Sequence, residues 1–315
     1  MLNHHYFGSL WIASLARSPA AVVLVLLAWG ATARAEHLTP TYCATGIPTD
    51  EATGWVPFPR GDVFCPLIAD PKADGSFVSY LRGDSTSAFG TDIGAVGVGD
   101  RFGLFRWGGP RPGEGLQVSL VGSVFAQFDL TTSSFDLVNA DYRIGLPVTF
   151  RWNRFSTRIR LYHQSSHLGD EFLLRTGIVR ENFAFESLEG IMSVDAGPLR
   201  AYAGGEYLFN LRPEEPVARL AHGGVELRQG RPLLEAGDLM SVRLVAGADV
   251  QALDRLDWDP AFSVRAGLEV GRPREAERPS RRWSILAEYY DGPSHYGQFF
   301  REHIHTFGVG MHFTP

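Results

Sequence analysis

Hydrophobic and polar residues alternate along most of the chain beyond residue 75. Residues 155–166 show this most clearly, since Phe155, Ile159 and Leu161 share one side while Arg158 and Arg160 share the other. Successive side chains of a β-strand point to opposite faces, so each such stretch predicts a strand with one apolar and one polar face. About twelve stretches show the pattern: residues 76–82, 91–105, 117–128, 137–150, 155–166, 181–194, 199–208, 217–228, 241–253, 262–271, 282–290 and 304–313.

An even number of alternating strands is typical of a bacterial outer-membrane barrel. The mean hydropathy of −0.07 agrees with this, because lipid-facing and lumen-facing residues average out along each strand. A water-soluble β-sandwich would also alternate, but it would turn its charges toward solvent. The pattern favours an all-β fold, an antiparallel transmembrane β-barrel of about 12 strands over residues 76–315.

The face predicted to line the barrel interior carries charges of both signs. A narrow barrel must fill its lumen with side chains, and paired charges can do so while neutralising one another. We therefore expect a lumen closed by salt bridges and a structural role for this set: Asp141, Arg143, Arg158, Arg160, Arg200, Glu206, Glu226, Arg228, Arg243, Asp249, Arg265, Glu269 and Glu288.

An apolar run near the N-terminus, residues 20–30, is too short to cross a bilayer as a helix. Arg17 precedes it, and Ala33-Arg34-Ala35 supplies small residues in the pattern that signal peptidase accepts. This arrangement predicts a cleaved signal peptide over residues 1–35, with the mature chain beginning at Glu36. The expected location of the mature protein is the bacterial outer membrane.

Cys43 and Cys65 are the two cysteines of the chain. In an exported protein they predict one disulfide, which closes a loop of roughly twenty residues and stabilises the fold by about 3 kcal/mol. A metal site is the weaker alternative, because no histidine lies near either cysteine. The surrounding residues, 36–75, are rich in proline and glycine and predict a periplasmic N-terminal cap or plug.

Two other classes of partner are disfavoured. The net charge of −6 argues against binding of nucleic acid. The glycines between residues 94 and 103 lie inside a predicted strand with no helix after it, so they do not indicate a nucleotide-binding loop.

The apolar side of residues 155–166 ends in two polar side chains, His163 and Ser165. They lie two positions apart on one face of the strand, which brings an imidazole within reach of a hydroxyl. Serine is a weak nucleophile until a histidine takes its proton, and the histidine needs an acid or amide to orient it. Two alternatives remain: the pair lies in the interfacial belt, where polar tips reach headgroups, or the register differs by one and the pair faces the lumen.

Several stretches of the chain resemble a bacterial outer-membrane family known only as a domain of unknown function. They are VFAQFDL at 124–130, FDLVNADYRIGLP at 135–147, YHQSSHLGDEFLLR at 162–175 and EYYDGPSHYGQFF at 288–300. The resemblance covers most of the predicted mature chain, and the YHQSSHLGDEF run is its most specific part. It implies an outer-membrane location and no established activity.

A shorter resemblance concerns chemistry. His163-Gln164-Ser165 is similar to the His-x-Ser pair that outer-membrane phospholipase A and the outer-membrane lipid A deacylases carry on a lipid-facing strand. This resemblance implies a serine-type acyl hydrolase that acts on outer-membrane lipids or lipopolysaccharide. The match weakens after the serine, because the phospholipase continues with asparagine and glycine, whereas this chain continues with Ser166 and His167.

The orienting residue is expected on the following strand, and we predict Glu181. It shares the apparent outward face with Phe183 and Phe185, and the asparagine next to it is the alternative if a bulge shifts the register. The phospholipase resemblance also implies assistance by Ca²⁺. Asp170 and Glu171, in the following outer loop, are the candidate ligands because carboxylates are hard oxygen donors. The alternative for these two is a solvated loop tip.

Two hypotheses of different classes follow from the sequence. The first is an outer-leaflet acyl hydrolase acting on phospholipid or lipid A, which requires His163 and Ser165 on one outward face beside an acid or amide. The second is a non-enzymatic barrel that serves as a structural protein, a narrow channel or a receptor. The second hypothesis requires only a filled barrel with outer loops.

Overall fold

The computed structural model describes residues 53–83, 90–111, 113–214, 216–237, 239–272 and 282–314. The predicted signal peptide and Cys43 lie outside the described residues, so the cleavage site and the Cys43–Cys65 disulfide stay predictions. All described residues belong to one compact unit, which spans residues 40–315.

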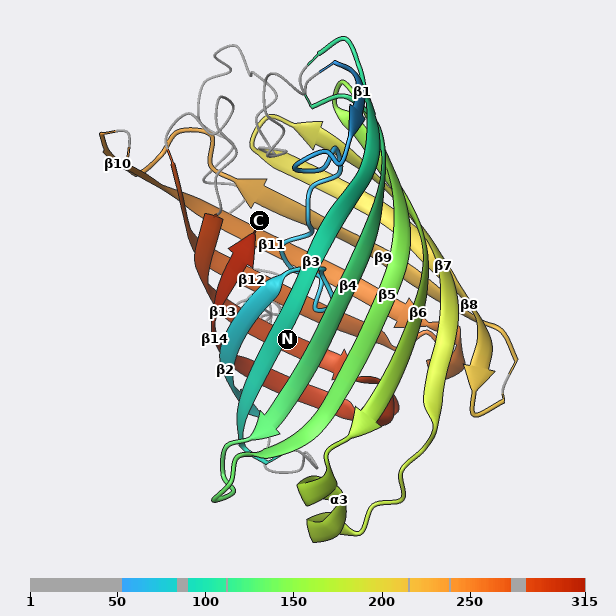
Figure 1. Ribbon diagram of the computed structural model, residues 1–315. Coiled ribbons are helices and arrows are strands. Elements are labelled where there is room, and N and C mark those ends of the chain that lie inside the picture. The colour runs from blue at the N-terminus through green and yellow to red at the C-terminus, as the bar shows by residue number, and fades with distance from the viewer. Residues whose placement is uncertain are drawn as a thin grey trace, which may run out of the picture. The chain divides into compact units, whose positions relative to one another are not determined.

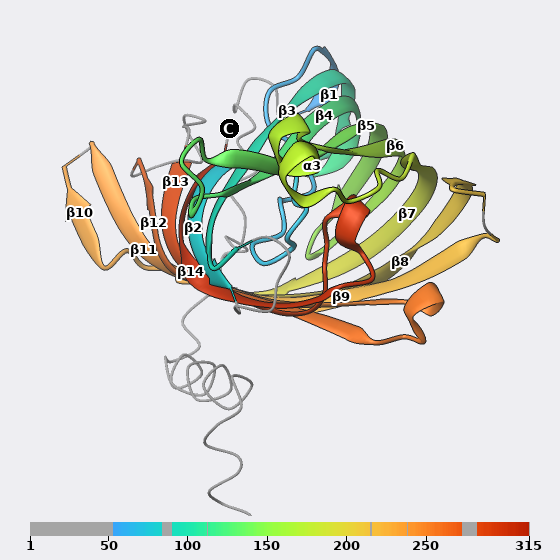
Figure 2. The same cartoon turned by 90° about the horizontal axis from the view of Figure 1, so that it is seen from below.

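The described chain forms a closed antiparallel β-barrel (Figures 1 and 2). The sheet has fourteen strands, and the twelve long ones form the ring, which closes because β3 pairs with both β2 and β4. Closure gives each ring strand a hydrogen-bonded neighbour on both sides, as a barrel in a membrane requires. The ring strands are β2 (Ser76–Gly83), β3 (Asp92–Gly108), β4 (Gly115–Asp129), β5 (Asp136–Trp152), β6 (Phe155–Leu168), β7 (Phe183–Ala196), β8 (Leu199–Arg212), β9 (Ala218–Arg228), β11 (Met240–Leu253), β12 (Pro260–Gly271), β13 (Arg282–Pro293) and β14 (His303–Thr314).

Two short strands stand outside the ring. β1 (Gly54–Pro57) pairs with the last residues of β3, and β10 (Leu234–Ala236) pairs with the first residues of β11. Every strand predicted from the sequence is therefore present in its predicted place, and the predicted transmembrane barrel of about 12 strands is confirmed.

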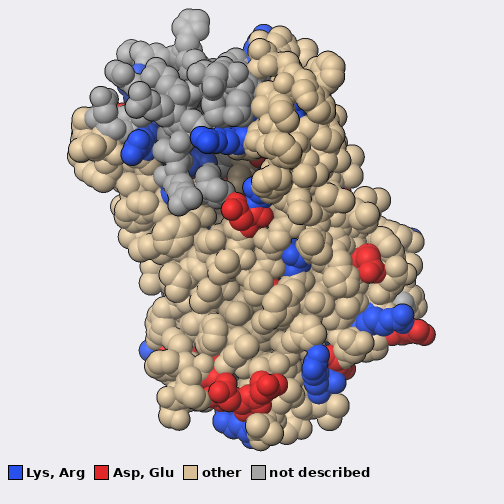
Figure 3. Space-filling model, viewed as in Figure 1, with Lys and Arg blue, Asp and Glu red and all other residues tan. Residues whose placement is uncertain are grey.

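The outward side chains of the ring are largely apolar. On β6, Ile159 and Leu161 are about half exposed, and on β14 Phe307 and Val309 are as well. The broad middle of the face in Figure 3 carries few charged side chains, whereas Asp, Glu, Lys and Arg gather mainly toward the two ends. An apolar band of this kind is the surface that a transmembrane barrel turns toward lipid.

Val138 of β5 departs from the predicted pattern. The alternation of residues 137–150 groups it with the outward Tyr142 and Ile144, but its side chain is fully buried in a cluster with Phe125 and Phe172. The ladder between β4 and β5 shifts here, since Gln127 pairs with Asn139 and Phe128 pairs with Leu137. The extra residue in β5 makes a bulge, and a bulge interrupts the regular alternation of the two faces.

In the part of the chain that the structure describes, helical structure consists of three short segments that connect strands, and α3 (Asp170–Thr176) lies at the bottom of Figure 1. α3 follows β6, η2 (Asp254–Leu256) follows β11, and η3 (Gly297–Phe299) precedes β14. Among the described residues, no helix has the length and apolar character needed to cross a membrane.

Residues 58–75, which connect β1 to β2, run inside the barrel (Figure 2). Val63, Phe64 and Ala69 are fully buried there. This segment has no regular structure, and arginines of the barrel wall donate hydrogen bonds to its carbonyls: Arg106 to Arg60 at 2.9 Å, Arg151 to Val63 at 2.7 Å, Arg200 to Cys65 at 3.0 Å and Arg265 to Asp70 at 3.1 Å. The wall thus satisfies backbone groups that would otherwise be buried without partners.

The luminal charges form pairs, as the sequence predicted. Arg158 and Arg160 both contact Glu189, and Arg160 also contacts Asp74 of the inner segment at 2.5 Å. Lys72 of the same segment lies 2.6 Å from Asp141. Other wall pairs include Arg200–Glu226, Arg228–Glu269 and Arg265–Glu288.

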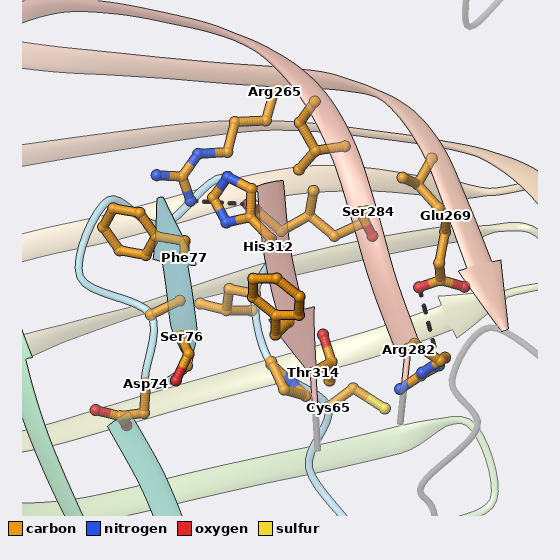
Figure 4. A pocket seen from close by; sticks show the side chains of 18 of the residues that line it. Cys65, Asp74, Ser76, Phe77, Arg265, Glu269, Arg282, Ser284, His312 and Thr314 are labelled. Carbon is orange, nitrogen blue, oxygen red and sulfur yellow. Dashed lines mark hydrogen bonds and ion pairs between the residues drawn. The ribbon is translucent and has the colours of Figure 1, made fainter. Parts of the chain in front are cut away.

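Two cavities lie between the inner segment and the wall. One, of about 100 Å³, is lined by Phe77, Arg265 and His312, with Glu269 and Arg282 forming an ion pair at its side (Figure 4). The other, of about 140 Å³, lies toward the opposite end, between Tyr162 of β6 and Leu253 of β11. Both cavities are lined in part by residues of the inner segment.

Candidate functional site on the outer face of β6

His163 and Ser165 lie on the outward face of β6, near the end of the strand that leads into α3. His163 is exposed and Ser165 is half-exposed, whereas Tyr162, Gln164 and Ser166 between and beside them are buried in the lumen. The predicted face and strand position of the two residues therefore agree with the structure, and the alternative register that would turn them inward does not.

The adjacent strands place a carboxylate beside the histidine. In the ladder between β6 and β7, His163 pairs directly with Glu186. The Nδ1 atom of His163 lies 3.2 Å from the Oε1 atom of Glu186, and the two side chains are 45% and 34% exposed. With the proton on Nδ1 the imidazole donates to the carboxylate, and Nε2 is left with a free lone pair.

The second oxygen of Glu186, Oε2, is shielded from solvent and has no hydrogen-bond partner among the described residues. A carboxylate oxygen in that situation is costly unless the group gains a positively charged neighbour. Protonation of His163 would supply that neighbour, because the imidazolium would lie within hydrogen-bond distance. The environment of Glu186 therefore suits a group that stabilises a transient imidazolium.

Glu181, the orienting residue predicted from the sequence, lies elsewhere. It precedes β7, and its backbone carbonyl accepts a hydrogen bond from the Nε2 atom of Gln298 at 2.9 Å. The prediction took Phe183 and Phe185 as outward, but both are buried and pack with Tyr162 inside the barrel mouth. That assignment was wrong, because the two aromatic rings fill the lumen here and leave the outward positions of β7 to Ala184 and Glu186.

A β-bulge lies next to Glu186. Ala184 pairs with Arg212 of β8, and Glu186 pairs with Phe209, so β8 contains one extra residue between these pairs. Asn210, within the extra stretch, has a φ of 51°, a left-handed conformation that asparagine tolerates better than most residues. Bulges bend a strand and redirect the side chains beside it. Here the bend lies directly beside the carboxylate that contacts His163.

The hydroxyl of Ser165 makes no hydrogen bond with the residues that the structure describes. Its ladder partners are Tyr142 of β5 and Ala184 of β7. Both ring nitrogens and the hydroxyl lie on the same face, two residues apart along the strand. In ligand-free sites the contact between nucleophile and base is often long and tightens when substrate binds.

Asp170 and Glu171, the candidate calcium ligands, occupy the first turn of α3 and are exposed. Negative charges at this position interact favourably with the helix dipole. Within the described parts of the chain, no group of three or more His, Cys, Asp or Glu side chains could hold a metal ion. The assignment of Asp170 and Glu171 as calcium ligands stays a prediction, and no step below uses a metal.

A family described as protein of unknown function, DUF1207, matches residues 35–314. The chain belongs to this family. The match covers the whole barrel and confirms the resemblance seen in the sequence. A comparison with curated protein sequences gives no match.

Two solved structures to which this DUF1207 barrel is similar are outer membrane phospholipases. Outer membrane phospholipase A from Escherichia coli has a TM-score of 0.51 and 13% identity, over 79% of this chain and 93% of that one. The Salmonella typhi outer membrane phospholipase, a dimer with bound calcium, has a TM-score of 0.50 and 12% identity, over 76% and 91%. At such identities the likeness shows the fold alone.

Glu186 is the residue of this candidate site that the sequence did not predict. The residues of β7 that face outward could have been identified from the end of the strand next to the short turn to β8. There, Met192 and Leu188 face outward. Counting back by twos from Leu188 reaches Glu186 and not Glu181. The signal was present, but the two phenylalanines at the start of the strand pointed to the opposite face.

Proposed function

We propose that this protein is an outer-membrane lipid acyl hydrolase in which Ser165 is the nucleophile, His163 the general base and Glu186 the orienting acid. The observation that carries the proposal is the contact between His163 and Glu186, on the outward face of β6 and β7 beside Ser165. A histidine and a carboxylate exposed toward lipid are costly as decoration, since a membrane offers them no water. In an acyl-transfer site the same two residues would act as the general base and the acid that orients it.

The reaction follows from the three groups. His163 Nε2 takes the proton of Ser165 as Oγ attacks the carbonyl carbon of an ester, and a tetrahedral intermediate forms. The intermediate collapses, the C–O bond of the ester breaks, and the imidazolium returns the proton to the leaving alcohol. A water molecule, deprotonated by His163, then attacks the acyl-serine, the bond between the acyl carbon and Ser165 Oγ breaks, and the imidazolium returns the proton to Oγ as the fatty acid leaves. Glu186 fixes the tautomer and stabilises the imidazolium in both steps.

The surroundings suit a substrate that stays in the bilayer. Leu161 precedes His163 on the same face of β6, Ile144 lies opposite His163 on β5, and Leu188 follows Glu186 on β7. All three are about half exposed on the outside of the barrel. Acyl chains would lie against this apolar wall while the ester reaches Ser165 from the side.

Two further features support an activity on the outer surface over transport. The similar fold belongs to proteins named as outer membrane phospholipases. In addition, the lumen is occupied by residues 58–75, which are held to the wall by arginine hydrogen bonds and ion pairs. A narrow channel would require this segment to leave.

The test is release of fatty acid by the refolded, detergent-solubilised protein, with phosphatidylglycerol and lipopolysaccharide offered separately. Ser165→Ala and His163→Ala should abolish release, and Glu186→Ala should lower it strongly. Glu181→Ala is the matched control, since it removes the neighbouring exposed carboxylate that does not contact His163. A difference in gel migration between unheated and heated samples would verify folding of each variant. No release from either lipid by the folded protein would overturn the proposal and leave the structural or receptor hypothesis.

A further inference from the structure

A basic pair lies just beyond Ser165 on the outer side. His167 is the next outward residue of β6, and its Nδ1 atom lies 2.6 Å from the Nη2 atom of Arg180. We propose that His167 and Arg180 bind the phosphate of the lipid whose ester reaches Ser165. The inference rests on the proposed function and names its substrate class: an acyl ester placed a few bonds from a phosphate.

The geometry leaves both groups with donors to offer. Arg180 donates to Nδ1 of His167, so the ring proton of the neutral imidazole is on Nε2. Arg180 makes no ion pair with a carboxylate among the described residues. Arg175 in the same loop is different, since it contacts Asp136 at 2.7 Å and Asp129 at 3.0 Å. The charge of Arg180 is thus available to a ligand, whereas the charge of Arg175 is not.

The end of the β6–β7 ladder makes room for this pair. β7 begins at Phe183, which pairs with Ser166, so no residue of β7 lies beside His167. Arg180 precedes β7 by three positions and occupies that side. On the other side, the ring of Tyr142 contacts the ring of His167 edge-on at 5.7 Å and supports its orientation.

The position of the pair matches the layout of a lipid. His167 is two residues from Ser165 along the strand, or about 7 Å at the rise of a β-strand. In a glycerophospholipid the phosphate lies a few bonds from the ester carbonyls, on the side away from the acyl chains. Here the apolar wall at Leu161 and Ile144 lies on one side of Ser165, and Arg180 lies on the other. An arginine fork is well suited to phosphate oxygens.

The loop that carries Arg180 has the character of a membrane-surface segment. Leu174 is 88% exposed and Val179 85% exposed. Large apolar side chains exposed beside a lipid-facing band are favourable if they enter the acyl boundary of the outer leaflet. That placement holds the neighbouring guanidinium at the level of the headgroups.

The binding experiment uses Ser165→Ala protein, so that the outcome does not depend on hydrolysis. Native mass spectrometry would count dioleoylphosphatidylglycerol and dioleoylglycerol retained after detergent removal. The phosphate-bearing lipid should be retained preferentially, and Arg180→Gln should reduce that preference by about tenfold, the worth of a charge-assisted hydrogen bond. Arg154→Gln, at the opposite end of β6, is the matched control. His167→Phe is the second variant if Arg180→Gln does not fold.

Kinetics on otherwise wild-type protein provide the other measurement. Arg180→Gln should raise KM for phosphatidylglycerol more than it lowers kcat, and Arg180→Lys should restore part of the loss. Lipid A with and without its phosphates distinguishes lipid A from phospholipid as the source of the phosphate. Equal retention of both diacyl lipids, or a preference untouched by Arg180→Gln, would overturn the inference while leaving hydrolysis intact. Absence of hydrolysis with a preference dependent on Arg180 would overturn only the proposed activity.

Discussion

Glu186 of β7 lies directly opposite His163 of β6, and its Oε1 atom is 3.2 Å from the imidazole Nδ1. The pair forms across a strand ladder, so its spacing is set by backbone hydrogen bonds on both sides and not by a flexible loop. Both side chains project from the outside of the barrel. The arrangement holds an imidazole and a carboxylate rigidly together on the outer face of the barrel.

The first prediction distinguishes two contributions of Glu186, the orientation of the His163 imidazole and the negative charge beside it. Glu186→Ala should lower kcat about a hundredfold, since the imidazole loses its tautomer restraint and the imidazolium loses its partner. Glu186→Gln should lower it less, because the amide oxygen can still accept from Nδ1–H. The check is the rate of fatty-acid release from phosphatidylglycerol at saturating substrate. Equal activity of the alanine variant and the wild type would exclude Glu186 from the mechanism.

The second prediction concerns additivity between His163 and Ser165. Two groups that act in one proton transfer are not independent, so removing both should cost no more than removing one. His163→Ala, Ser165→Ala and the double variant should share one residual rate. Release measured for the three variants under the same conditions tests this. Multiplicative losses would mean that the two residues contribute separately.

The sequence alone was sufficient to predict the barrel, because the alternation of apolar and polar residues indicates both where a strand lies and which of its faces points outward. In β14, Phe307, Val309 and Met311 face outward as predicted, and the charged residues of β11 and β12 face the lumen. The pattern can be recognised in each strand without knowing which strands lie beside it. The exceptions were Val138, where a bulge adds one residue and no local signal marks it, and the two phenylalanines at the start of β7, Phe183 and Phe185, which are buried inside the barrel.

The site was predicted only in part, for a reason of register. His163 and Ser165 lie on one strand, so their shared face follows from spacing. Glu186 is brought to them by the pairing of β6 with β7, and the fourteen residues between these strands, 169–182, do not fix that pairing. The contacts of the inner segment could not be predicted either, because they form only in the folded barrel. Asp74, for example, contacts Arg160 across the lumen.

The third prediction tests how the inner segment is held. Lys72 and Asp141 are both buried and lie 2.6 Å apart, and the ammonium also lies over the ring of Tyr296 at 4.3 Å. Lys72→Met should reduce the free energy of unfolding by about 3 kcal/mol, because it leaves a buried carboxylate without its partner. Urea unfolding in lipid vesicles is the measurement.

Two further variants make the test of Lys72 specific. Adding Asp141→Asn to Lys72→Met should recover part of the lost stability, since the uncompensated charge is removed. Arg111→Met is the control, because Arg111 is 69% exposed and its contact with Glu114 is 3.7 Å long. Exposed pairs contribute about 1 kcal/mol or less. Unchanged unfolding of Lys72→Met would show that the pair does not hold the segment.

The fourth prediction concerns pH and a histidine of the outer loop. His295 is buried after the end of β13, where burial, and then the positive charges of Lys72 and Arg265, hold its pKa well below the usual range, with Glu288 acting in the opposite direction. Its Nδ1 atom has no hydrogen-bond partner among the described residues, and its ring contacts Tyr290 and Tyr296. The histidine is therefore neutral in the folded protein at neutral pH.

In the unfolded chain, His295 would take up a proton below its ordinary pKa of about 6.5. The unfolded state then binds more protons than the folded state, so stability is lost as the pH falls below that value. His295→Phe should retain the ring contacts and remove this loss. Between pH 7.5 and pH 5.5 the wild type should lose about 1 kcal/mol more than the variant, as measured by urea unfolding at both pH values. Identical losses in the two proteins would mean that His295 does not titrate between its folded and unfolded states in this range.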